Sequence, residues 1–206
     1  MFTINKSSQM EIEYLDNSPI YTMNNFYEYP EKVIEYLSTN PSFLHKDFIK
    51  PSFNGKYFED RRQQIDTDKA NHIYDMLSRI CGQKPLRKNV IMTNIFTFKD
   101  IEFNDYKNNY WWPHKDSGFT GIVYFNDDQT TGTNLYKNIS DNPKGNEHYE
   151  PWRSKDKWEL IHTLKSGFNK FVMFDGKKFF HGMKIENDIY SDKGYRVNQV
   201  FFFRES

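Results

Sequence analysis

The sequence reads WWPHKDSG at residues 111–118, and this stretch decides the fold and the function that we expect. His114 and Asp116 lie two positions apart, and an apolar run with β-branched residues, Phe119 to Phe125, follows them. In a strand, side chains at i and i+2 point to the same face, about 6.6 Å apart at ~3.3 Å of rise per residue. An imidazole and a carboxylate placed in this way can bind one metal ion from the same face of a strand. The stretch therefore predicts one half of a metal site, carried by a β-strand.

A His-x-Asp pair is weak evidence when it stands alone. The chain has six His and 16 Asp in 206 residues, so chance predicts about half of one such pair in a shuffled chain of this composition. The prediction therefore depends on a third ligand and a positively charged partner from later strands. His181 and Arg196 supply these two groups.

The composition favours a β-rich domain with an aromatic core. Aromatic residues make up 18% of the chain, with 19 Phe and 14 Tyr, and packed rings of this kind fill barrels and sandwiches. Lys plus Arg and Asp plus Glu each number 28, so the formal net charge is zero. Because binding to a phosphate backbone needs clustered cations, this argues against a nucleic-acid partner, although a nucleotide as a small substrate stays open. The single cysteine, Cys81, excludes an internal disulfide and a multi-cysteine zinc site.

We expect no secretory signal peptide at the beginning of the sequence. MFTINK at residues 1–6 lacks the apolar core of a secretory signal peptide. No apolar stretch reaches the ~18 residues that a membrane helix needs. We therefore expect a soluble, cytoplasmic protein that does not enter a membrane.

Two helices are predicted in the N-terminal part of the chain. Apolar residues recur at helical spacing over residues 29–38 and again over 66–80. Residues 1–21 fit one or two short strands, and residues 45–60 have the composition of a loop. We expect this part, residues 1–89, to support the sheet that follows.

From residue 90 onward the pattern changes to alternation, which indicates strands. Residues 90–98 are the first strand, 111–126 carry the His-x-Asp pair into the second, and 195–204 are the last. Helices followed by roughly eight strands are consistent with a jelly-roll-like double sheet. We therefore expect one domain that is mainly β with flanking helices and has its core in residues 90–206. The polar segment 137–160 is either a functional cover or a surface excursion.

Two imidazoles and one carboxylate can occupy one face of an octahedral ion and leave three positions open. This ligand set suits non-haem Fe(II) better than Zn(II), which usually takes fewer ligands. The open positions can hold a bidentate 2-oxoacid and then dioxygen, and an arginine fork can bind the far carboxylate of that acid. Arg196 lies 15 residues after His181 (196 − 181), among apolar strand residues. A guanidinium buried there needs an anionic partner.

Taken in this order, the residues resemble the Fe(II)/2-oxoglutarate-dependent dioxygenase superfamily, with its His-x-Asp…His…Arg signature. The resemblance covers residues 90–203 and includes GIVYFN at 121–126, GTNLY at 132–136 and FDG at 174–176 ahead of the distal His181. The last of these is similar to the prolyl-hydroxylase-like branch. The resemblance implies a double-stranded β-helix with helical support.

The resemblance also implies the roles of individual residues. His114, Asp116 and His181 are the expected catalytic ligands of Fe(II). Because Asp116 keeps the carboxylate that halogenating members have lost, oxygen transfer from O2 is favoured, with 2-oxoglutarate as the cosubstrate. The expected reaction is hydroxylation of a C–H bond in a small molecule or in an amino-acid or peptide side chain. Iron and cosubstrate carry that chemistry, and the protein supplies placement and shielding.

Three further residues are expected to contact the cosubstrate. By resemblance, Arg196 holds the distal carboxylate of 2-oxoglutarate. Asn198 stands where the family often has Ser or Thr, and an amide there can still donate a hydrogen bond. Tyr124 shares the strand face of the metal ligands, and it is either a second contact to the cosubstrate or a core tyrosine.

Two other classes of protein stay open at this point. A non-catalytic jelly-roll for sugar binding or particle assembly would use the aromatic residues, but it would not need an inward-facing Arg196. A cupin-type metal enzyme without 2-oxoglutarate more often has additional His or Glu ligands. Glu at the matching spacing is missing here.

Overall fold

A computed structural model gives the structure of the protein and describes residues 1–44, 58–66, 68–87, 90–98, 105–128, 131–140, 151–191 and 194–204. Within these ranges the chain forms fourteen strands, three α-helices and one short 3-10 helix. The protein is therefore mainly β with few helices, as the sequence predicted.

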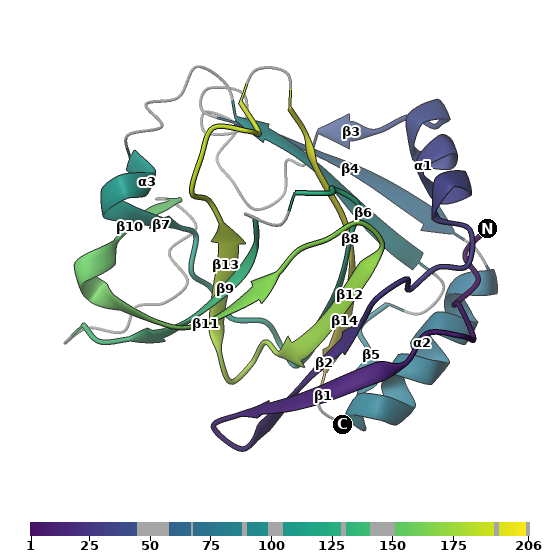
Figure 1. Cartoon of the computed structure of the whole chain (residues 1–206), viewed down its shortest axis with the longest axis horizontal. Helices are drawn as coiled ribbons and strands as arrows, with labels where there is room; N and C mark the ends of the chain where they lie inside the picture. Colours follow the sequence, from purple (N-terminus) through teal and green to yellow (C-terminus); the bar gives the residue numbers. More distant parts are fainter. Residues whose placement is uncertain are drawn as a thin grey trace.

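The largest element is a sheet of nine strands in which all strand pairs are antiparallel (Figure 1). From one edge to the other it contains β1 (Met10–Leu15), β2 (Ser18–Met23), β12 (Lys170–Asp175), β8 (Phe119–Tyr124), β14 (Arg196–Arg204), β6 (Val90–Phe98), β4 (Phe58–Asp66) and β3 (Phe43–Leu44). The ninth strand, β5 (Lys84–Pro85), pairs with the end of β14. Strands far apart in the sequence, such as β2 and β12 or β6 and β14, are therefore neighbours.

A second sheet faces the large one and contains β11 (Trp158–Lys165), β9 (Gly132–Asn138) and β13 (Phe180–Lys184). Figure 1 shows this small sheet on one side of the large sheet and the two long helices on the other. A third, two-stranded sheet pairs β7 (Asn109–Trp111) with β10 (Trp152–Ser154). The large sheet thus has one face toward helices and one toward strands.

The two long helices lie close to their predicted positions. Helix α1 (Pro30–Thr39) begins with a proline. Proline is tolerated in the first turn because the backbone N–H groups there have no acceptor within the helix, so the N–H that proline lacks is not needed. Helix α2 (Asp68–Cys81) ends before Gly82, whose φ of 69° suits the left-handed residue that closes a helix. The shorter elements are α3 (Asp105–Asn108) and the 3-10 helix η1 (Lys155–Lys157).

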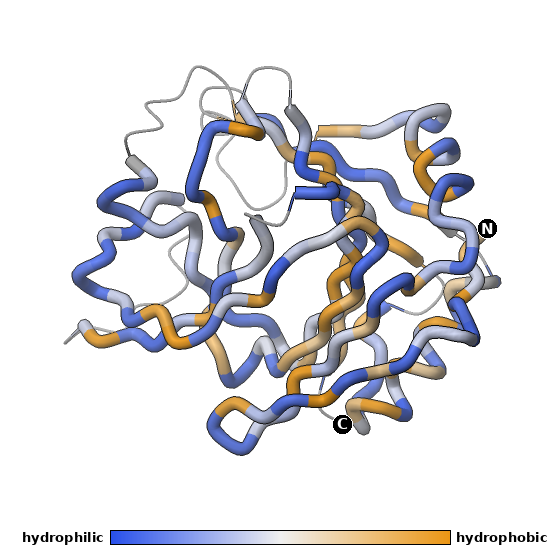
Figure 2. Tube along the Cα trace, viewed as in Figure 1, coloured by the Kyte–Doolittle hydropathy of each residue, from blue (hydrophilic) through white to orange (hydrophobic). Residues whose placement is uncertain are grey.

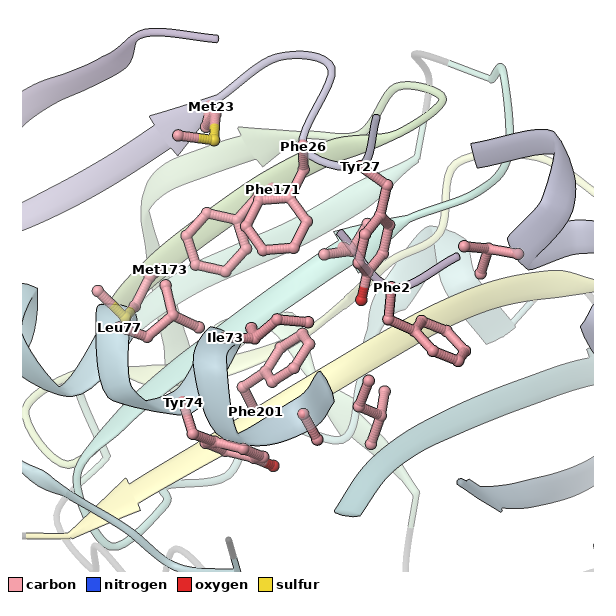
Figure 3. Close-up of a cluster of buried hydrophobic side chains, with 14 of the residues drawn as sticks. Phe2, Met23, Phe26, Tyr27, Ile73, Tyr74, Leu77, Phe171, Met173 and Phe201 are labelled. Atoms are coloured by element: carbon pink, nitrogen blue, oxygen red, sulfur yellow. The ribbon is translucent and has the colours of Figure 1, made fainter. Parts of the chain in front are cut away.

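Aromatic and aliphatic side chains fill the space between the helices and the large sheet (Figure 3). Phe26 stacks on Phe171 with ring centroids 4.7 Å apart, and Tyr74 of α2 meets Phe201 edge-on at 5.4 Å. Burial of one such side chain contributes about 1.5–3 kcal/mol. This cluster therefore anchors both helices on the outer face and leaves the other face free to carry the site.

The opposite face of the large sheet, called the inner face from here on, packs against the small sheet. Ile122, Val172 and Val200 on the inner face join Leu135 and Leu164 of the small sheet in one buried cluster. Figure 2 shows apolar residues gathered along the central strands of the large sheet. Because side chains alternate along a strand, residues two positions apart in β8 and β14 line the same interior.

The predicted strand over residues 111–126 is wrong as one continuous element. The chain leaves β7 at Trp112, whose φ of 49° lies in the left-handed region. Pro113, the next residue, has no N–H to donate to a ladder. Regular pairing resumes only in β8, so His114 and Asp116 lie in the break between two strands.

Two other predicted segments contain strands that the pattern did not indicate. The predicted loop 45–60 overlaps the start of β4, and residues 45–57 lie outside the described part of the chain. The polar segment 137–160 contains β10, η1 and the start of β11, and residues 141–150 of it lie outside the described part. None of the helices among the described residues combines the length and the apolar character that spanning a bilayer requires.

Candidate metal centre

Backbone pairing brings His114 and His181 together. They form an isolated antiparallel bridge in which each residue donates its N–H to the carbonyl oxygen of the other, at 3.0 and 2.8 Å. Residues directly opposite each other in such a bridge project to the same side. The two imidazole rings therefore stand next to each other, with centroids 4.4 Å apart.

Asp116 joins the two histidines through contacts of its own. Its N–H donates to the carbonyl oxygen of Gly176 at 2.9 Å, which holds the backbone against the turn after β12. Its Oδ2 accepts a hydrogen bond from Thr120 at 2.5 Å. One ligand atom from each of His114, Asp116 and His181 lies within 4.8 Å of the other two. The structure thus assembles the three residues that the sequence singled out.

Each imidazole is held through its Nδ1 by a backbone carbonyl. Nδ1 of His114 lies 2.8 Å from the carbonyl oxygen of Trp112, and Nδ1 of His181 lies 3.2 Å from that of Phe179. A carbonyl oxygen only accepts, so each Nδ1 carries a proton, and Nε2 of each ring is the atom left to bind a metal. Backbone carbonyls orient metal-binding histidines in this way.

The contact between His181 and Asp116 requires a positive charge. Nε2 of His181 lies 3.1 Å from Oδ2 of Asp116, and a lone pair that faces a carboxylate at this distance is repelled unless a proton or a cation lies between them. Two ligands at about 2.1 Å from one ion and at right angles to each other are about 3.0 Å apart. The observed separation therefore fits a shared metal ion, and the donor set of two nitrogens and one oxygen suits Fe(II).

The electrostatic surroundings keep Asp116 ionised. Burial raises the pKa of this carboxyl, but the neighbouring imidazoles of His181 and His114 and the hydroxyl of Thr120 lower it more. The net pKa lies well below the ordinary value for Asp. An anionic carboxylate is the form that binds a cation, so the site is prepared for a metal over the whole neutral range.

Close backbone approaches allow this assembly. A Cβ on Gly182 would lie 2.2 Å from the carbonyl oxygen of Trp111, and a Cβ on Gly176 would lie 2.6 Å from Oγ1 of Thr120. Neither position can therefore hold a side chain without moving the segments that carry the ligands. Trp112 is strained at φ 49°, and this conformation aims its carbonyl at His114.

Arg196 is buried on the inner face of the large sheet, with only 8% of its surface exposed. Its Nη2 donates to the carbonyl oxygen of Gly132 at 3.2 Å, and its guanidinium lies over the ring of Tyr124, 5.5 Å from the centroid. Its Nε is buried without a hydrogen-bond partner among the described residues. Burial lowers the pKa of Arg196, partly offset by Tyr124 and Tyr190, yet an arginine stays charged. Such a cation calls for an anion that the described chain does not supply.

Tyr124 and Asn198 are neighbours of Arg196 on the same face. Asn198 is directly opposite Tyr124 in the pairing of β14 with β8. The hydroxyl of Tyr124 is hydrogen-bonded to Oγ1 of Thr133 at 2.7 Å, which is the bond of a satisfied core tyrosine. Oδ1 of Asn198 is buried and has no hydrogen-bond partner in the part of the chain that the structure describes. Of the two, Asn198 is therefore the one with capacity for a ligand.

Several residues beside Asp116 or elsewhere on the inner face could not be found from the sequence. Thr120 and Gly176 act on Asp116 from other elements, and no local pattern marks them. Asp60 and Arg62 lie on the inner face of β4, a strand whose run of charged and polar residues gave no β signal. The only hint was an Asp-x-Arg spacing, which places two opposite charges on one face if the segment is a strand.

Comparison with known proteins gives no family. No protein-family model matches the sequence, and no curated protein sequence matches it either. Among solved structures, the Fe(II)/α-ketoglutarate-dependent dioxygenase TqaL is similar with a TM-score of 0.39 and 11% identity, over 87% of this chain and 75% of that one. IDO from Bacillus thuringiensis is similar with a TM-score of 0.39 and 12% identity, over 88% of this chain and 96% of that one. Likenesses of this size carry no argument about function, which depends on the residues of the site.

Proposed function

We propose that the protein is an Fe(II)- and 2-oxoglutarate-dependent oxygenase that hydroxylates a C–H bond of a small molecule or of an amino-acid or peptide side chain. The observation that carries the proposal is the meeting of three ligand side chains, His114, Asp116 and His181, within 4.8 Å. The buried guanidinium of Arg196 supports it, because a structural metal site has no need of a second, unpartnered cation on the same inner face.

The metal would be held by nitrogen and oxygen atoms that already point at one another. His114 and His181 would bind through Nε2, since Nδ1 of each is engaged with a backbone carbonyl. Asp116 would bind through a carboxylate oxygen, and Thr120 keeps that group oriented through its hydrogen bond to Oδ2. These supports fix the ligands before the metal arrives, which strengthens binding.

The cosubstrate would be held by Arg196. A guanidinium can bind the distal carboxylate of 2-oxoglutarate with two parallel hydrogen bonds, and Nε of Arg196 is available for one of them. Asn198, two residues further along β14 on the same face, can donate a further hydrogen bond to that carboxylate through its amide Nδ2–H. Tyr124 packs against the guanidinium and keeps it in place. When iron, 2-oxoglutarate and O2 are bound, they supply the oxidising chemistry, with succinate and CO2 as by-products.

The order in which strands enter the two layers supports a double-stranded β-helix. From β6 onward the chain visits the large sheet, the bridge at His114, the large sheet again with β8, and then β9 and β11 in the small sheet. It continues through β12 in the large sheet, β13 in the small sheet and β14 in the large sheet. We infer that these eight segments form one catalytic domain, with the N-terminal strands and helices as its support. The turn at Asp175 and Gly176, whose carbonyl holds Asp116, favours the prolyl-hydroxylase-like branch.

An anaerobic titration tests the proposal. Fe(II) added to the protein with 2-oxoglutarate should produce the weak visible charge-transfer band of the chelate. His181→Ala should abolish the band, while His162→Ala, which alters a histidine outside the cluster, should keep it. Arg196→Met should raise the 2-oxoglutarate concentration at half-saturation by about 100-fold or more, whereas Arg204→Met at the exposed end of the same strand should not. A chelate that forms equally well in His181→Ala would refute the proposal.

A further inference from the structure

The inner face of the large sheet carries a second arginine, Arg62 of β4, which the proposed chemistry does not use. Cross-strand pairing places Arg62 opposite Asn94 of β6, Asn94 opposite Asn198 of β14, and Asn198 opposite Tyr124 of β8. Directly opposed residues have Cβ atoms about 5 Å apart. One polar row therefore runs across the inner face from β4 to β8, and it links Arg62 to the proposed cosubstrate site.

Arg62 is held in place by Asp60, two residues earlier on the same face. Its Nη2 donates to Oδ2 of Asp60 at 2.8 Å, and its Nε lies 3.1 and 3.2 Å from the two carboxylate oxygens. Its side chain is 20% exposed, and among the described residues Nη1 of Arg62 makes no hydrogen bond. The ion pair thus fixes the guanidinium and leaves one edge of it available to a ligand.

Asn94 adds an acceptor next to this donor. Its Oδ1 is buried and has no hydrogen-bond partner among the described residues, although a buried polar atom is costly to leave unpaired. A ligand that fills this row must therefore bring a hydrogen-bond donor for Asn94 and an acceptor for Arg62. An ammonium group next to a carboxylate meets both requirements.

The two arginines differ in whether a neighbouring carboxylate balances their charge, and this determines the charge of the ligand that each one favours. The charge of Arg62 is balanced by Asp60, so this end of the face favours a ligand that is neutral overall. No carboxylate balances Arg196 among the described residues, so that position favours an anion. A dicarboxylate such as 2-oxoglutarate thus fits Arg196, and a zwitterion fits Arg62 and Asn94.

The rows of the sheet also give the orientation of such a ligand. The next row toward Asp116 begins with the polar Gln64 of β4 and continues through Met92 of β6, Val200 of β14 and Ile122 of β8, which are apolar. Beyond it lies Thr120, which contacts Asp116. A molecule with its polar end at Arg62 would therefore extend an apolar part toward the metal ligands.

From this geometry, and resting on the proposed function, we propose that the substrate is a free α-amino acid. Its carboxylate binds Arg62, its ammonium group binds Asn94, and its side chain is the part that lies at the metal. A residue inside a peptide presents neither charge, so the same geometry disfavours a peptide substrate.

Direct binding measurements test this proposal with the whole 206-residue chain. The twenty protein L-α-amino acids are titrated one at a time by anaerobic calorimetry, with Fe(II) and 2-oxoglutarate present. At least one should bind, and Arg62→Met should weaken that binding by roughly 30-fold. Arg61→Met is the matched control, because Arg61 forms the same kind of ion pair, with Glu59, on the opposite face of β4. It should change the binding by less than about 3-fold. Arg62→Lys, which keeps the charge without the planar fork, should weaken binding by about 10-fold.

Analogues of the tightest-binding amino acid identify the groups that are recognised. Its carboxamide should bind roughly 30-fold more weakly to the wild-type protein and should lose nothing further in Arg62→Met, because the partner of Arg62 is already missing. Its N-acetyl derivative should also bind more weakly. An N-acetyl carboxamide that binds as tightly as the free amino acid would overturn the proposal in favour of a peptide.

The visible band of the Fe(II)–2-oxoglutarate chelate separates the two proposals. It should form in Arg62→Met as in the wild type, which also shows that the variant is folded. If the band forms and no amino acid binds, or if Arg62→Met and Arg62→Lys bind amino acids normally, this inference is wrong and the oxygenase proposal stands. If the band is absent from the wild-type protein, the oxygenase proposal itself fails, and this inference fails with it.

Discussion

Replacing Gly182 with alanine should disrupt the metal centre without altering any ligand. A Cβ at this position would lie 2.2 Å from the carbonyl oxygen of Trp111. Ordinary van der Waals contact needs more than 3 Å, so β13 and the segment before His114 would have to separate by about 1 Å. The bridge bonds between His114 and His181, now 3.0 and 2.8 Å, would then lengthen beyond hydrogen-bonding distance.

The magnitude follows from these contacts. Two lost backbone hydrogen bonds cost about 1 kcal/mol each, and overpacking costs about 1–3 kcal/mol. The total is about 3–5 kcal/mol, and for a chain of this length 1 kcal/mol corresponds to about 2–4 °C in Tm, so Gly182→Ala should melt about 6–20 °C lower. Metal affinity should fall by at least about 10-fold, because the imidazoles would no longer share one centre.

Thermal melting and a metal titration measure the two effects. Gly167→Ala is the control, since a Cβ there would lie 3.7 Å from side-chain atoms of Lys170, in ordinary contact. This variant should melt within about 2 °C of the wild type and bind metal normally. A Gly182→Ala protein with the Tm and the metal affinity of the wild type would refute the reasoning.

Three further predictions concern Asp116 and Cys81. Thr120→Val removes the hydrogen bond to Asp116, so the carboxylate is less firmly oriented and Fe(II) affinity in metal titrations should fall by about 10-fold, equally at pH 5 and pH 8 because Asp116 stays ionised at both. In the metal-free protein the pKa of Asp116 is lower than in the unfolded chain, so the unfolded state binds more protons at acid pH. The free energy of unfolding measured in urea should therefore contain a contribution from Asp116 that is complete above about pH 4 and falls away below it. In Asp116→Asn the free energy of unfolding should fall less steeply over this acid range. Burial raises the pKa of the Cys81 thiol, so iodoacetamide should modify Cys81 at pH 7 more slowly in the folded protein than in the urea-unfolded chain.

The metal ligands could be predicted from the sequence because their signal is chemical. His114, Asp116, His181 and Arg196 are residue types that bind metal ions and carboxylates, and their order along the chain indicates a shared function. The sequence predicted that His114 and Asp116 lie within one strand, and this was wrong because Trp112 ends that strand in a left-handed conformation. Tertiary contacts, above all the bridge between His114 and His181, bring the ligands together instead.

Strand β4 shows where sequence patterns fail for a physical reason. Residues 59–64 are all charged or polar, so neither alternation nor β propensity marks them. The strand forms because its backbone pairs with β6 over nine residues and its ends bury Phe58 and Ile65. A polar strand facing an interior is expected where a site needs charge there rather than packing, and Asp60 and Arg62 fit that description.

The central claim is that His114, Asp116 and His181 share one iron ion. Anomalous X-ray diffraction at the iron absorption edge, from crystals grown anaerobically with Fe(II), tests it most directly. The account predicts a peak within about 2.3 Å of Nε2 of both histidines and of a carboxylate oxygen of Asp116. No peak there, or one bound by other residues, would contradict it.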